Sequence, residues 1–405
     1  MYPLRTMLFF NRQDTHSTAT TIARMASSPL RKLERETFRP LPFAIGAFGM
    51  SLLTLGMRAL PVSAVSPTDL GPALMQSTAD ILPVTSEEVY RADQLADLGV
   101  QAFTQGDKVT AFEHWQQAML LYRVGEVPEK EARMLENLSV VYRLTDRPAE
   151  AISMSRQAIS IYDSLGITDE QPSAFLNLGS AYRLDGQFEE AIATYKISLN
   201  RYQQTQDTTG ERIILSLLAD TYGDVEDYAQ SIAFQEQVLA IAQANSHTRV
   251  EAESLSELGY AYFVLSQYEQ SIAYYQQSLL LAQQLGDRPQ EVTVLNNLGR
   301  AAALSQDFDT ALEAYQQALV IFRELNRPVQ EAHLLVNIGQ AYAEQGQADA
   351  AIEAFNQVVE LAESIRHQQS ESALPPRLEA AYRELAVLLQ QSNRNSEATQ
   401  VLSLI

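Results

Sequence analysis

Asparagine recurs in this 405-residue chain at one spacing, 40 residues or a multiple of 40. The row consists of Asn137, Asn177, Asn297 and Asn337, with Asp97, Leu217 and Glu257 at the other places of the same series. A side-chain amide carries both a donor and an acceptor, so a row of amides can hydrogen-bond to the main chain of a bound peptide whatever its sequence. The alternative is that the amides hydrogen-bond only within the protein and hold no ligand.

Four arginines accompany this row: Arg133, Arg143, Arg183 and Arg300. The chain is acidic, with 29 Lys and Arg against 50 Asp and Glu and a net charge of −21, and the part after residue 64 carries −26. Arginines on such a background suit a carboxylate or an acidic motif. The alternative is that they neutralise adjacent acids such as Glu136 and Glu344. A body this acidic repels phosphate, so nucleic-acid binding is not expected.

Groups that would support catalysis are scarce. The chain has no cysteine, which excludes thiolate metal sites, a cysteine nucleophile and a lipidated cysteine anchor. Its five histidines are dispersed, and no H-E-x-x-H, P-loop or G-x-S-x-G pattern occurs. The sequence therefore predicts a protein that is not an enzyme and needs no cofactor or metal.

A repeat of 40 residues must position these side chains. In this repeat a small residue recurs every 40 positions, as Gly99, Ser139, Gly179, Ala219, Gly259, Gly299 and Gly339. A second small residue follows 12 places later, as Ala111, Ala151, Ala191, Ser231, Ser271, Ala311 and Ala351. Four places further stand Trp115, Tyr195, Tyr275, Tyr315 and Phe355, with Ser155 and Gln235 in the other two copies. An eighth unit comes after seven additional residues, with Leu385, Ala386, Leu389 and Ala398 at matching places.

Each unit reads as two antiparallel helices, A and B. Apolar positions recur at three and four residues, and stretches such as LDGQ and LSQD interrupt them as turns. The join at residues 285–292 has Gly286 to end one helix, Asp287 to cap the next and Pro289 in its first turn. The small residues allow A and B to approach closely, and the aromatics are expected to fill the gap between one pair and the next.

The pattern L-G-x-x-Y followed by A-x-x-x-F/Y resembles the tetratricopeptide repeat (TPR), about eight times over residues 93–405. The 40-residue units are similar to those of kinesin light chains and of many bacterial TPR arrays. The resemblance implies an all-α fold, an α-solenoid of about eight antiparallel helix pairs wound into a right-handed superhelix. It also implies an inner wall of A helices that holds an extended or helical peptide. On that wall it places the four asparagines, Arg133, Arg143, Arg183 and Arg300, and the aromatic residues Phe103, Tyr260 and Phe263.

The predicted function is a non-enzymatic protein–protein interaction scaffold that holds a peptide segment of a partner in the concave groove. The expected peptide-binding residues are Asn137, Asn177, Asn297, Asn337, Arg143, Arg183, Arg300 and Tyr260. The partner segment is expected to be acidic or to bear a free carboxylate. Two alternatives remain open, a self-associating assembly factor and a peptide-responsive sensor domain. For the aromatic residues, the alternative is a place in the core.

Residues 1–64 resemble a targeting region. A basic stretch at 31–39 precedes an apolar stretch at 41–57, and Val62, Ser63 and Ala64 form an A-x-A-like site. This order indicates a cleaved signal peptide, with an uncleaved single membrane anchor or a buried helix as alternatives. The first two place the body across a membrane, exported or anchored by 41–57, and any membrane contact is expected only through that segment. Residues 65–90 read as a linker, and 91–405 as the repeat array.

Overall fold

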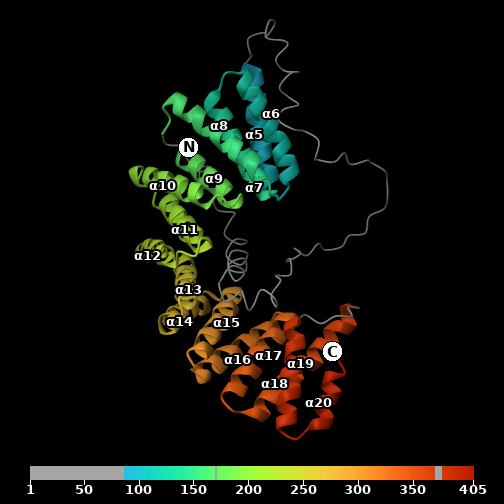
Figure 1. Cartoon of the computed structure of the whole chain (residues 1–405). Helices are drawn as coiled ribbons and strands as arrows, with labels where there is room; N and C mark the ends of the chain where they lie inside the picture. The colour runs from blue at the N-terminus through green and yellow to red at the C-terminus, as the bar shows by residue number, and fades with distance from the viewer. Residues whose placement is uncertain (1–85, 169–170, 370–375) are drawn as a thin grey trace, which may run out of the picture. The chain divides into compact units, whose positions relative to one another are not determined.

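The computed structural model describes residues 86–168, 171–369 and 376–405, and within these ranges it contains sixteen helices and no strand (Figure 1). The described residues divide at Gly186 into an N-terminal and a C-terminal unit. The N-terminal unit contains α5 (Ser86–Thr104), α6 (Lys108–Val124), α7 (Pro128–Leu144), α8 (Pro148–Leu165) and α9 (Gln171–Leu184). The C-terminal unit begins with α10 (Phe188–Gln204), α11 (Thr208–Asp224), α12 (Tyr228–Ala244), α13 (Thr248–Val264) and α14 (Tyr268–Leu285). It continues with α15 (Arg288–Leu304), α16 (Phe308–Glu324), α17 (Pro328–Glu344), α18 (Ala348–Gln369), α19 (Pro376–Gln391) and α20 (Asn395–Leu402).

Within each unit, helices that follow one another in the chain pack as antiparallel pairs, which confirms the predicted α-solenoid architecture. The eighth pair is α19 and α20, and its predicted packing residues Leu385, Ala386, Leu389 and Ala398 are all buried. The first helix begins at Ser86, a few residues before the expected start of the array at 91. The predicted targeting region at 1–64 lies outside the described residues, so export or anchoring stays a prediction. No helix within the described ranges is long and apolar enough to cross a bilayer.

The turns recur with a period of 20 residues. A residue with positive φ stands at every twentieth position from Gly106 to Gly346, in the turns within pairs and in those between pairs. Two helices of 17 residues and two turns of three residues account for a 40-residue unit, as in α11, α12 and the turns that follow them. At the predicted join, Gly286 has φ 65° and Asp287 accepts a hydrogen bond from the amide of Gln290, so both assignments are confirmed.

In four of the helix pairs that the structure describes, an aromatic ring of helix B packs on a glycine of helix A. A Cβ atom at Gly99, Gly259, Gly299 or Gly339 would lie less than 3.0 Å from a ring atom of, respectively, Trp115, Tyr275, Tyr315 or Phe355. The ring comes from helix B of the same pair, so each of these aromatics packs within its own pair, a contact that the prediction of rings between one pair and the next did not include. The reason is that the missing Cβ leaves a notch on helix A, and the ring fills it at ordinary contact distance.

In two further pairs, α7 with α8 and α11 with α12, the glycine and the ring have been replaced together. In the pair α7 and α8 the residues are Ser139 and Ser155, whose hydroxyl oxygens lie 2.7 Å apart in a buried hydrogen bond. In the pair α11 and α12 they are Ala219 and Gln235, which are both buried. A Cβ on helix A is therefore found where helix B has no ring to collide with it.

Candidate peptide-binding face

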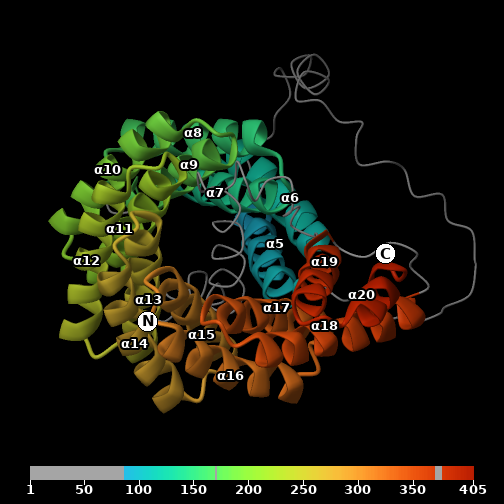
Figure 2. The same ribbon diagram turned by 60° about the horizontal axis from the view of Figure 1, so that its bottom comes forward.

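In the C-terminal unit, α11, α13, α15 and α17 lie along the inside of a curve, and α12, α14, α16 and α18 lie along the outside (Figure 2). We call the side of the first four helices that is turned to the inside of this curve the inner face. The predicted residues Tyr260, Asn297, Arg300 and Asn337 lie on these helices. Asn137, Arg143, Asn177 and Arg183 lie on α7 and α9 of the N-terminal unit, where all four are partly buried.

The asparagines do not behave as a uniform row. The Asn337 side-chain oxygen accepts a hydrogen bond from the guanidinium of Arg377 on α19, so this amide bridges two neighbouring A helices. That is the structural alternative considered above. Asn297 is different, because its side chain is only 4% exposed and its Oδ1 atom has no hydrogen-bond partner among the residues that the structure describes. A buried amide without a partner costs free energy, and such a group often marks a binding site.

The arginines also separate into two kinds. Arg133 forms an ion pair with Glu129 one turn earlier, at 2.7 Å, and Arg143 and Arg183 have interaction partners within the fold. Arg300 forms no ion pair with any residue that the structure describes. Its guanidinium carbon lies 5.1 Å from the centre of the Phe263 ring, which holds the cation on an aromatic face.

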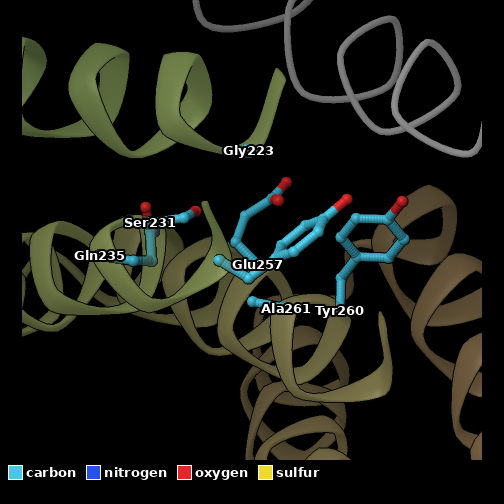
Figure 3. A pocket seen from close by; sticks show the side chains of 7 residues that line it. Gly223, Ser231, Gln235, Glu257, Tyr260 and Ala261 are labelled. Carbon is cyan, nitrogen blue, oxygen red and sulfur yellow. The ribbon is translucent and has the colours of Figure 1, made fainter. Parts of the chain in front are cut away.

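The aromatic residues expected on the inner wall are mostly in the core. Phe103 packs on Trp115 with ring centres 5.4 Å apart, and Phe263 is buried. Tyr260 is partly exposed and lines a pocket between α11, α12 and α13 (Figure 3). The pocket is lined by Gly223 of α11, by Tyr228, Ser231 and Gln235 of α12, and by Glu257, Tyr260 and Ala261 of α13. The Glu257 carboxylate and the Tyr260 hydroxyl point to the same side of α13.

Glu253, one turn before Glu257, has an unusual environment. Burial raises its pKa to about 7, and nearby Glu257 and Asp287 add to this effect against the attraction of Arg249 and Arg212. Burial also lowers the pKa of Arg212, although Glu253 opposes that shift and an arginine keeps its proton in proteins. Arg249 is ion-paired with Asp287, which caps the N-terminus of α15, so charges from α11, α13 and the start of α15 meet here.

His333 on α17 is, like Glu253, a titratable group with a shifted pKa that no sequence motif indicates. Burial, with a smaller effect of Arg377, lowers its pKa to about 4. Glu253 and His333 both stand six places before the small residue of their repeat, a place that the TPR pattern assigns to the inner wall. The repeat position of Glu253 and His333 therefore indicates that they lie on the inner wall, whereas the burial that shifts their pKa values could not be predicted from the sequence.

These groups can hydrogen-bond and form ion pairs, but they are not arranged for metal binding. No group of three or more His, Asp or Glu side chains within the described ranges is placed to hold a metal ion. The described part of this face carries the Arg300 guanidinium, the Asn297 amide with its unpartnered Oδ1 atom, and a pocket lined by the Glu257 carboxylate.

Comparisons with known proteins agree with the fold. Family models described as tetratricopeptide repeat match residues 132–163, 170–244, 250–324 and 306–364, which together span more than half of the chain. The apo form of RapI is 13% identical, with a TM-score of 0.50 over 68% of this chain and 99% of that one. A Signal Transduction ATPase with Numerous Domains protein from Pyrococcus horikoshii, which has a tetratricopeptide repeat sensor, is 17% identical, with a TM-score of 0.51 over 79% and 52% of the two chains. BtubC from P. vanneervenii is 21% identical, with a TM-score of 0.46 over 54% and 89%. No curated protein matched the sequence.

Proposed function

The chain is a tetratricopeptide repeat protein, and we propose that its array is a non-enzymatic scaffold that holds an extended segment of another protein on the inner face. Repeat arrays of this kind present long concave surfaces suited to protein–protein interaction. The proposed mechanism is hydrogen bonding and ion pairing along the A helices, without covalent chemistry. The proposed segment carries a carboxylate, either on an acidic side chain or at its C-terminus.

The observation that carries this proposal is the guanidinium of Arg300. Acidic residues outnumber basic ones in this protein, yet the Arg300 guanidinium forms no ion pair with any described residue. It is held against the ring of Phe263 instead. Arginine binds carboxylates in a planar, two-pronged geometry, and stacking on a ring leaves its N–H groups available at the edge. Asn297 lies three residues earlier on α15, on the same side of the helix, and its Oδ1 atom lacks a partner among the described residues.

We expect Arg300→Ala to weaken peptide binding by about tenfold or more, about 1.4 kcal/mol, because the carboxylate loses its only charged anchor. The thermal midpoint should change little, because the partly exposed guanidinium holds no other charged group in place. The measurement is the affinity of the full chain for peptides selected on it from a random library with free C-termini. Asn297→Ala should act in the same direction.

Asn356→Ala is the matched control, because Asn356 is exposed on the outer helix α18. Equal affinities of the wild type and Arg300→Ala would contradict the proposal. A full chain that selects no peptide but forms an oligomer that Arg300→Ala dissociates would show instead that the face holds a second copy.

A further inference from the structure

The pocket lined by Glu257 and Tyr260 forms where three departures from the repeat pattern meet. Gln235 stands where most copies have an aromatic ring, and Glu257 stands in the asparagine series. Gly223 stands four places after the first small residue, where other copies carry larger side chains. That set comprises Phe103, Arg143, Arg183, Phe263, Ala303 and Ala343. Three side chains from adjacent helices have thus changed in size or charge at one point.

The next pair shows what fills this space in other copies. Tyr275 is the counterpart of Gln235, and its ring packs on Gly259. Burial raises the pKa of the Tyr275 hydroxyl, and the nearby positive charge of Arg300 opposes this shift. Arg300 stands in the following repeat at the place that Tyr260 occupies in its own. A tyrosine therefore reaches from helix B to the next A helix. Gln235 is smaller than tyrosine, and the Cβ of Ala219 would collide with a ring at this place, so the space stays open.

The groups around the opening suit a cation. Glu257 provides a carboxylate, Gln235 and Ser231 provide neutral oxygens, and the rings of Tyr228 and Tyr260 provide aromatic faces (Figure 3). No lysine or arginine lines the pocket. Glu257 also repels the carboxylate of Glu253 one turn away, where Arg249 and Arg212 attract it, and this repulsion adds to the raised pKa of Glu253. A positive group entering the pocket would reduce this repulsion between carboxylates.

We infer that this pocket takes the lysine or arginine side chain of the bound segment, an inference that rests on the proposed function. Tyr260 and Arg300 occupy the same place in consecutive repeats, on the packed helices α13 and α15. Packed helices lie about 8–10 Å apart, a distance that an extended chain covers in about three residues. The segment therefore carries its basic residue about three residues from the carboxylate held by Arg300.

The test uses peptides selected by the full chain from a random library, followed by affinity measurements with single members. Selected peptides should be enriched in Lys or Arg at one position, and replacing that residue with norleucine should weaken binding about tenfold. Glu257→Gln should weaken the basic peptide by a similar factor and leave the norleucine peptide unaffected, because the two changes remove the same ion pair. Arg300→Ala should weaken both peptides equally.

A second variant closes the pocket without touching Glu257. Ala219→Gly combined with Gln235→Tyr restores the glycine and ring found in other pairs, so it should fold at least as stably and lose affinity for the basic peptide. The matched control is Ser139→Gly combined with Ser155→Tyr, which makes the same kind of change in α7 and α8 of the N-terminal unit. The control should leave affinity unchanged.

The outcomes separate the inference from the function on which it rests. Selection of no peptide at all would overturn the proposed function. Selected peptides without an enriched basic residue, or a basic residue whose contribution is unchanged in Glu257→Gln, would overturn the cation pocket and leave the scaffold standing.

Discussion

Replacing Gly299 with leucine is expected to lower the free energy of unfolding of the C-terminal unit by about 3 kcal/mol or more. Even a Cβ at this position would lie less than 3.0 Å from the ring of Tyr315, which is buried against α15. The ring cannot move aside without leaving its own packing site. Chemical denaturation followed by circular dichroism measures the loss, and hydrogen exchange should locate it in α15, α16 and the adjacent helices, because repeat arrays are stabilised by nearest neighbours.

Gly223→Leu is the matched control, because Gly223 is also helical but a Cβ there would meet only the Ser231 hydroxyl, at 3.7 Å. It should change stability by less than about 1 kcal/mol. Combining Gly299→Ser with Tyr315→Ser recreates the pair of Ser139 and Ser155, so the double variant should be less destabilised than the sum of its single changes. Strict additivity would show that the glycine and the ring do not form a unit.

Glu253→Gln is expected to stabilise the protein above pH 7, by up to about 3 kcal/mol. The folded-state pKa of Glu253 is about 7, raised from an ordinary value of 4.5. Between these values the folded protein holds the proton more firmly than the unfolded chain does, so the contribution of Glu253 falls as the pH rises. Glutamine removes this dependence, and the difference between variant and wild type should vanish below about pH 4.5. Urea unfolding at several pH values measures it, with Glu236→Gln on the exposed side of α12 as the control.

His333→Gln is expected to show the opposite dependence. Its folded-state pKa is lowered from 6.5 to about 4, so its contribution is complete above pH 6.5 and is lost as the pH falls toward 4. The variant should therefore lose less stability on acidification than the wild type, whereas Glu253→Gln should lose more. In the wild type the two effects oppose each other between about pH 4.5 and 6.5. Parallel pH profiles of all three proteins would contradict both assignments.

The fold was predictable because its determinants are local and repeated. Small residues at positions such as Gly259 and Gly299, with turns between them, define the helix pairs before any contact is known. The partner of each ring was not predictable in the same way. The spacing between Gly299 and Tyr315 fits a ring on its own pair or on the next, and only the structure distinguishes the two.

The binding face was only partly predictable. The repeat pattern selected Arg300 and Tyr260, but it treated Asn297 and Asn337 as equivalent although one is unpartnered and the other bridges to Arg377. Arg377 was missed because it follows the additional residues before the eighth unit, where the spacing of 40 no longer applies. The pocket was missed because it arises from absent side chains contributed by adjacent helices, which no single motif describes.

The even spacing of the turns restricts how the gene for such a protein can change its length. Because a positive-φ residue stands at every twentieth position from Gly106 to Gly346, a duplication or deletion of 40 codons joins one turn to an equivalent turn and preserves the alternation of A and B helices. A change of 20 codons would also join two turns, but it would place two A helices or two B helices in succession, so that a glycine and a ring no longer meet. Recombination in steps of 40 codons can therefore lengthen or shorten the array without redesigning its interior.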